Sequence, residues 1–186
     1  RLDKTKVPKA RIAVGPEGSG THVQAMKILR VNQIENHPFL LPLHNDEAVA
    51  ALKKGEVDVV IMVDGLRSKN VQALLNDPDV KLFDFLRAAA YTKNIHYLEE
   101  LMVPMGAFNL ARNFPPEDSR MISTVTNLLI DDRMHPAIQF LFLRAAQEIN
   151  GKESFFAKRG EFPSFKNSEF PESPIAQQFH QRGLPI

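Results

Sequence analysis

The stretch VGPEGSGTH, residues 14–22, decides how the rest of the chain is interpreted. It follows a short apolar run that begins at Ile12 and precedes apolar residues at helical spacing, so it is expected to join a strand to a helix. A nucleotide-hydrolysing P-loop that started at Gly15 would need Lys and then Ser or Thr, but the chain has Thr21 and His22. The stretch therefore predicts a loop whose backbone binds an anion without hydrolysing a nucleotide.

The predicted ligand contacts lie in this loop, at the expected N-terminus of the first helix. Ser19 is a favourable N-cap residue, and the first turn of a helix offers unpaired N–H groups and the positive end of its dipole. Gly18 and Gly20 let a ligand approach the backbone, and the hydroxyls of Ser19 and Thr21 can donate hydrogen bonds to its oxygens. Glu17 disfavours a doubly charged phosphate. We therefore interpret the loop as a site for a small carboxylate, with a simple capped turn as the alternative.

The predicted fold class is α/β with a mostly parallel sheet. From residue 10 to about residue 105, short apolar runs alternate with amphipathic stretches of helical period, which is typical of βαβ units. The expected strands cover residues 11–15, 39–43, 57–63 and 80–85. The expected helices begin with Ser19, Asn45 and Ser68 as N-caps.

After residue 104 the pattern changes at several prolines. A strand rich in β-branched residues is expected at 122–130, and a helix is expected from His135 with Pro136 at its first position. One face of that helix fits a core stripe, made of Ile138, Leu141, Phe142, Ala145 and Ile149. A short helix is expected near residues 175–182.

A second candidate contact, Asp64-Gly65, follows the expected strand at 57–63. Ligands of open parallel sheets bind beyond the carboxyl ends of the strands, so this dipeptide and the glycine-rich loop are expected on one rim. Asp64 can accept a hydrogen bond from an amine or hydroxyl of a ligand, although a plain Asp-Gly turn is the alternative. Tyr91 can reach the same rim, or it can pack in the core of an alanine-rich helix.

Composition and motifs exclude several functions. The 23 basic and 22 acidic residues are spread along the chain, so no basic stripe for nucleic acid exists. The longest apolar run in the strand region, residues 59–63, is far shorter than the roughly 20 residues of a membrane span. Cysteine is absent, the six histidines show no metal-ligand spacing, and no G-x-S-x-G motif occurs. We expect no catalytic residue, metal or cofactor, and we do not expect an enzyme.

Six segments together resemble the C-terminal half of TAXI-type solute-binding proteins of TRAP transporters. They are RIAVGPEGSGT (11–21), ALKKGEVDVVIMVDG (51–65), VKLFDFLRAAAY (80–91), LMVPMGAFNLARNFPPED (101–118), HPAIQFLFLRAAQEING (135–151) and GEFPSF (160–165). The resemblance spans nearly the whole chain, and its specificity lies in the combination and order of the segments.

The resemblance implies the type II periplasmic binding protein fold, in which two α/β lobes close about a hinge on a small, commonly carboxylate-bearing solute. Such a receptor lies in the periplasm, with a signal or anchor segment upstream, and hands its solute to the permease subunits in the membrane. Residues 10–105 would form the complete second lobe, and residues 106–186 would be a crossover, a strand and helices that return to a first lobe largely missing from this chain. Matched by motif, Ser19, Gly20 and Thr21 are the expected ligand contacts; Gly65 and Tyr91 also match, whereas Asp64 departs from the small or polar residues of the family.

Two consequences of this interpretation are open to test. An effector-binding domain of a transcription regulator uses the same two-lobed fold, and the sequence upstream would distinguish it by a DNA-binding module in place of a signal or anchor. Without a first lobe, apolar residues such as Val125, Leu128 and Ile130 would be exposed. We expect a homodimer, a domain swap or the chain's own tail to cover them.

Overall fold

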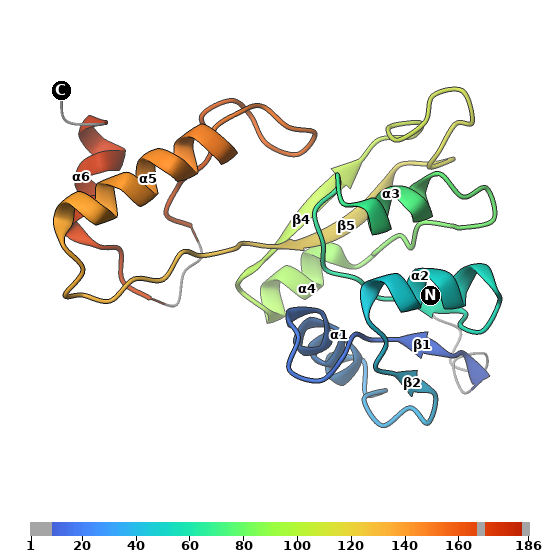
Figure 1. The fold of residues 1–186 in the computed structure, drawn as a ribbon. Helices are drawn as coiled ribbons and strands as arrows, with labels where there is room; N and C mark the ends of the chain where they lie inside the picture. Colours follow the sequence, from blue (N-terminus) through green and yellow to red (C-terminus); the bar gives the residue numbers. More distant parts are fainter. Residues whose placement is uncertain (1–8, 167–169, 184–186) are drawn as a thin grey trace. The chain divides into compact units, whose positions relative to one another are not determined.

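A computed structural model describes residues 9–166 and 170–183 of the chain (Figure 1). It contains two compact units, Arg1–Leu82 and Phe83–Ile186. This boundary divides the present chain, whereas the predicted division at residue 105 concerns lobes of a two-lobed protein and stays a prediction.

The first unit is built on a three-stranded parallel sheet, which confirms the α/β class. Its elements in chain order are β1 (Ile12–Ala13), α1 (Gly20–Val31), β2 (Leu40–Leu41), α2 (Asn45–Lys53), β3 (Val59–Val60) and α3 (Lys69–Leu75). The strand order is β2-β1-β3, so the connection through α2 crosses over β1. The strands are shorter than expected. Hydrogen bonds from Val14 N to Leu41 O and from Ile61 N to Ala13 O, both 2.9 Å, extend the contact between strands by one step.

The central strand β1 is buried on both faces. Ile12 and Val14 form one apolar cluster with α1, and Ala13, which lies between them, forms another with α2. Successive side chains of a strand point to opposite faces, so α1 and α2 cover opposite faces of the sheet. Since α3 packs against α2, the loop after β1 leaves the sheet toward one face while the loops after β2 and β3 leave toward the other.

Side-chain caps explain where the helices of this unit begin. Ser19 Oγ accepts a hydrogen bond from His22 N at 3.1 Å, and Ser68 Oγ accepts one from Val71 N at 3.2 Å, which confirms both predicted N-caps. The prediction for α2 was wrong by one residue, because His44 is its N-cap and donates its N–H to Glu47 Oε2 at 2.9 Å. Asn45 is instead the first residue of the helix.

An ion pair joins the amino ends of β1 and β3. Arg11 donates to Asp58 through its backbone N, Nε and Nη2, at 2.8, 3.0 and 2.9 Å. These hydrogen bonds, with the charge of the guanidinium, lower the pKa of Asp58 to about 2. The pair fixes β1 beside β3 at the end of the sheet opposite the glycine-rich loop.

The second unit contains α4 (Ala88–Asn94), β4 (Leu98–Val103), β5 (Ser119–Thr124), α5 (Pro136–Asn150) and α6 (Pro174–Arg182). Strands β4 and β5 pair antiparallel, from Leu98 opposite Thr124 to Val103 opposite Ser119. The strand expected at 122–130 therefore ends at Thr124 and begins earlier than predicted. Strand β4 has no counterpart in the sequence-based prediction.

The strand expected at 80–85 is not formed. Phe85 N donates to Arg120 O at 2.9 Å, but the N–H of Arg120 donates to the carboxylate of Asp84 at 2.7 Å. A side chain thus takes the hydrogen bond that a neighbouring backbone carbonyl would accept in a sheet, and the segment follows the start of β5 without extending the ladder.

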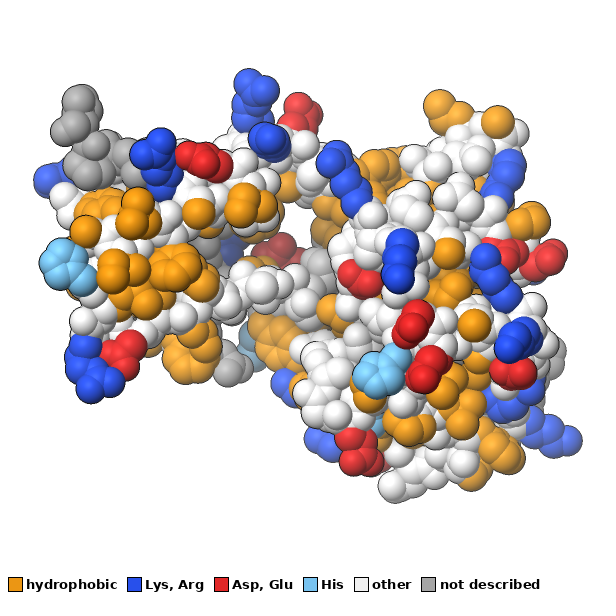
Figure 2. All heavy atoms as spheres, viewed as in Figure 1, with side chains coloured by type: hydrophobic (Ala, Val, Ile, Leu, Met, Phe, Trp, Pro, Cys, Tyr) orange, Lys and Arg blue, Asp and Glu red, His pale blue; other side chains and the backbone are white. Residues whose placement is uncertain are grey.

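Helix α5 begins at Pro136 with His135 as N-cap, and α6 begins at Pro174, as the sequence predicts within one residue. The predicted core stripe of α5 is wrong, because its large side chains are exposed: Ile138 46%, Leu141 63%, Phe142 43% and Ile149 72%. Figure 2 shows hydrophobic side chains on the surface in the region of α5. Helix α6 packs against α5 but leaves this face open. Leu128 is 60% exposed, as expected, whereas Val125 and Ile130 are half-buried.

Candidate functional site

The glycine-rich loop leads from β1 into α1 and has the backbone that its sequence predicts. Gly15 and Gly18 have φ of +79° and +80°, in the left-handed region that glycine enters without steric cost. Ser19 N donates to Pro16 O at 3.1 Å, which closes a tight turn before the helix. Gly18 and Gly20 are exposed, so the predicted approach of a ligand to this backbone is sterically open.

The first turn of α1 has unpaired main-chain donors. His22 N donates to Ser19 Oγ, whereas the N–H groups of Gly20 and Thr21 have no hydrogen-bond partner among residues 9–166 and 170–183. These groups lie at the positive end of the helix dipole. An oxygen of a small anion is a suitable acceptor for them.

Thr21 is held by the protein rather than directed to solvent. Its side chain is buried, with the residue 7% exposed, and Oγ1 accepts a hydrogen bond from Val63 N at 3.2 Å. Val63 lies beyond the carboxyl end of β3, so this bond joins the loops that follow β1 and β3.

His22 is a residue of the loop whose role the sequence did not reveal. Its Nδ1 lies 3.0 Å from Gly15 O, and since a carbonyl only accepts, Nδ1 carries the hydrogen. The ring therefore closes the loop from Gly15 to the first turn of α1. The ring of His22 is not placed to act as a base for Ser19, because Ser19 Oγ accepts from the backbone N of His22 and the ring contacts Gly15 O.

Asp64 and Gly65 form a turn directly beside this loop. Asp64 Oδ1 accepts from Gly65 N at 2.7 Å, and Oδ2 accepts from Asn45 Nδ2 at 3.4 Å. Both residues of the dipeptide are exposed. Because Asn45 opens α2, the loops after all three strands of the sheet meet at one edge, as predicted for the carboxyl ends of parallel strands.

Tyr91 belongs to the second unit, in α4. Its ring packs edge-on against Phe85, with centroids 5.8 Å apart, and the guanidinium of Arg87 lies 6.0 Å from the ring centroid. These contacts match the packing alternative for Tyr91. Its part in the rim stays a prediction.

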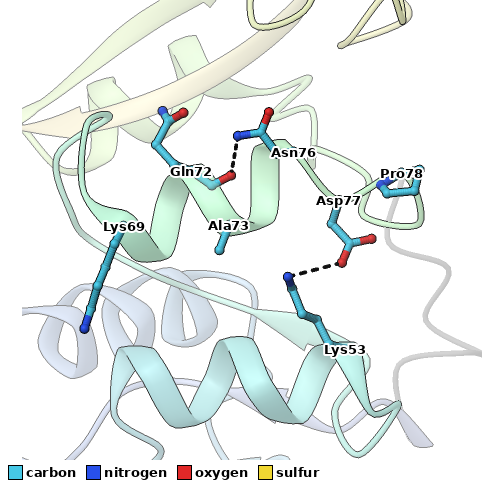
Figure 3. Close-up of a pocket in the computed structure, with 7 residues that line it drawn as sticks. All are labelled: Lys53, Lys69, Gln72, Ala73, Asn76, Asp77 and Pro78. Atoms are coloured by element: carbon cyan, nitrogen blue, oxygen red, sulfur yellow. Dashed lines mark hydrogen bonds and ion pairs between the residues drawn. The ribbon is translucent and has the colours of Figure 1, made fainter.

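A separate depression of about 470 Å³ lies between α2 and α3 (Figure 3). It is lined by charged and amide side chains together with Ala73 and Pro78; the lining residues are Lys53, Lys69, Gln72, Ala73, Asn76, Asp77 and Pro78. Lys53 Nζ lies 3.6 Å from Asp77 Oδ2, so the two opposite charges balance each other within the depression. No residue predicted as a ligand contact lines it.

The described residues contain neither a cluster of metal ligands nor a helix that could span a membrane. In the part of the chain that the structure describes, no three acidic or histidine side chains come close enough to share a metal ion. Over the same residues, every helix is too short or too polar to traverse a bilayer.

The glycine-rich loop, the sheet behind it and the adjoining Asp-Gly turn fall within one family match. The model of the NMT1-like family matches residues 4–124, which is well over half of the chain. The chain belongs to the NMT1-like family. This is a periplasmic-binding-protein-like family, and its membership fits a solute-binding protein. Binding proteins of this kind are generally non-enzymatic and typically extracytoplasmic. No curated protein matched the chain.

The match to the NMT1-like family includes every predicted ligand contact and ends at the last residue of β5. Helices α5 and α6 lie outside it. The sequence alone did not reveal that Asn45, Val63 and His22 connect the loops of the rim. A signal existed only for Asn45, whose position at a helix start follows from its capping propensity.

Proposed function

We propose that this NMT1-like protein is the extracytoplasmic solute receptor of a TRAP-type secondary transporter of the TAXI family. It binds a small carboxylate-bearing solute and delivers it to the permease subunits in the membrane. The observation that carries the proposal is that the N–H groups of Gly20 and Thr21 have no hydrogen-bond partner among the described residues and follow the exposed backbone of Gly18 at the carboxyl edge of the parallel sheet. The family match supports a role in solute binding.

In the proposed complex one carboxylate of the solute accepts hydrogen bonds from the N–H groups of Gly20 and Thr21 and from the hydroxyl of Ser19. Hydrogen bonds to a charged group contribute about 1.5–3 kcal/mol each. Three of them contribute about 5–9 kcal/mol before the cost of association is subtracted, so micromolar affinity would require further contacts in the closed site. Gly18 leaves room for the solute, because a Cβ added there would meet no atom within 4 Å.

The side of the proposed site opposite the N-terminus of α1 carries an acidic residue. Asp64 is exposed and its carboxylate can accept a further hydrogen bond from an amine or a hydroxyl of the solute, while Gly65 keeps the backbone beside it open. Closure of two lobes about a hinge would then surround the solute. Tyr91 remains a proposed contact on the strength of the resemblance alone.

Replacement of Ser19 by Ala tests the proposal. Titration calorimetry of butyrate into the full-length protein is expected to show at least about tenfold weaker binding for Ser19→Ala, because one charged hydrogen bond and the cap are lost. Thr21→Ala is expected to weaken butyrate binding less than Ser19→Ala does, because the side chain of Thr21 bonds to Val63 N and only its main chain contacts the solute in the proposed complex. Ser173→Ala is the matched control, since Ser173 caps α6 through Ala176 N in the same way but lies outside the sheet. Unchanged affinity of Ser19→Ala would remove the loop from the mechanism.

A further inference from the structure

The geometry points to the side chain of Thr21 as a positioning residue, which fixes the distance between the N-terminus of α1 and the carboxylate of Asp64. This inference rests on the proposed function and deepens it. The main chain of Thr21 contacts the solute, whereas its side chain decides where a second polar group of the solute must lie.

The hydroxyl of Thr21 holds the two loops together. Oγ1 accepts the hydrogen bond of Val63 N at 3.2 Å, and the bond spans 42 positions in the sequence. The loop after β1 leaves the sheet toward the face covered by α1, and the loop after β3 leaves toward the face covered by α2. The hydrogen bond of Thr21 therefore joins two loops that lead to opposite faces of the sheet.

The methyl group of Thr21 fixes the side chain itself. A Cβ added to Gly15 would lie 2.8 Å from Cγ2 of Thr21, so the methyl group occupies the space beside the Gly15 backbone. His22 Nδ1 binds the carbonyl oxygen of the same glycine. Thr21 is therefore buried between the loop and β3 in a single arrangement.

The hydrogen bond between Thr21 and Val63 also affects the position of Asp64, the next residue in the chain. Val63 directly precedes Asp64, whose carboxylate is further oriented by Gly65 N and by Asn45 Nδ2. Any shift of Val63 moves this carboxylate relative to the N–H groups of α1. Solutes with a carboxylate at one end and a donor at the other should depend on Thr21 more strongly than simple carboxylates do.

Two substitutions of Thr21 test its hydroxyl and its methyl group separately. Thr21→Val keeps the shape and loses the acceptor for Val63 N, while Thr21→Ser keeps the acceptor and loses the methyl group. Amide hydrogen exchange at Val63 in the full-length protein is expected to become about fivefold faster in Thr21→Val, the effect of one lost hydrogen bond. Thr21→Ser is expected to stay within about twofold of the native rate.

Binding of 4-aminobutyrate and of butyrate measures the effect on the site. These probes share a carboxylate and a carbon chain, but only the first has an ammonium group for Asp64. The native protein and Thr21→Ser are expected to prefer 4-aminobutyrate, and Thr21→Val is expected to lose most of that preference. A loss of folded protein would weaken both probes equally, so the ratio of the two affinities reports position rather than stability.

Asp64→Asn provides a second test that leaves the bond of Thr21 intact. It should abolish the preference for 4-aminobutyrate and leave exchange at Val63 unchanged. The inference is overturned if exchange at Val63 in Thr21→Val equals the native rate, or if Thr21→Val keeps the native preference. Binding of neither probe by the native protein, with exchange at Val63 responding as expected, would instead reject the proposed function for such solutes and leave Thr21 as a purely structural link.

Discussion

Among the single residues of this protein, Gly15 and Gly18 have nearly the same backbone conformation but different surroundings. Both have φ near +80°, yet a Cβ at Gly15 would overlap Thr21 and a Cβ at Gly18 would meet open space. Gly18→Ala is therefore expected to lower the free energy of unfolding by about 1–2 kcal/mol, the cost of a left-handed backbone. Gly15→Ala is expected to cost about 1–3 kcal/mol more because of the overlap. Urea unfolding followed by circular dichroism measures both, and equal values would show that Thr21 moves aside freely.

The ion pair of Arg11 and Asp58 makes the stability of the fold depend on pH. The pKa of Asp58 falls from 3.8 to about 2 in the folded protein, so the pair stabilises the fold at pH values above 3.8 and the stabilisation is lost as the pH falls through about 2. At pH 7, Asp58→Asn is expected to lower the midpoint of thermal unfolding. The difference from the native protein should shrink between these two pH values and vanish below them. A difference that is constant with pH would contradict this account.

The residues of the candidate site differ in how far sequence could predict them. Ser19 and the glycines beside it were predictable because a cap and a left-handed turn depend on residues only a few positions away. The partner of Thr21 was not predictable, since Val63 lies 42 positions away and every residue except proline has a backbone N–H. The ring contact of His22 with Gly15 was missed because histidine in a first helical turn has many possible partners.

Helices and strands also differ in how far they could be predicted, depending on whether nearby or distant residues determine them. Helices α1, α3 and α5 begin where Ser, His and Pro signals place them, because capping is local. The parallel order of the sheet also follows from the alternating pattern. The strand at 80–85 and the buried stripe of α5 were wrong because both depend on a distant surface, and apolar spacing alone cannot show whether that surface is present.

The segment that replaces the strand at 80–85 depends on one carboxylate. Asp84 accepts the N–H of Arg120, so Asp84→Ala leaves that amide without its partner at the start of β5. We expect a loss of about 1–3 kcal/mol in the free energy of unfolding, measured by urea unfolding. The control is Asp79→Ala, an exposed position where the expected change is within about 0.5 kcal/mol. Equal effects of the two substitutions would show that the contact of Asp84 is not stabilising.

At the scale of the whole molecule, the exposed apolar face of α5 is the feature that favours binding to another protein surface. Four large apolar side chains of this helix are exposed, and Leu128 and Leu129 on the segment before it are 60% and 58% exposed. A surface of this kind favours association. We propose that a second copy of the chain covers it when no other lobe does.

Sedimentation velocity tests this association. The native chain is expected to sediment as a dimer at micromolar concentration, and Leu141→Glu is expected to shift it to a monomer because a charge would enter the apolar contact. Leu110→Glu is the control, since Leu110 is 88% exposed and lies in the connection between β4 and β5. A native monomer, or a dimer equally weakened by both substitutions, would place the interface elsewhere.

The burial of β1 on both faces also limits how the length of this chain can vary among its relatives. Removal or insertion of one residue between Ile12 and Gly15 would exchange the side chains that face the two helices, placing Ala13 where Ile12 or Val14 now fills space. The damage would extend along the strand and could not be absorbed locally. Residues 35–38, between α1 and β2, carry no such constraint, so indels are expected to collect there and to be excluded from β1.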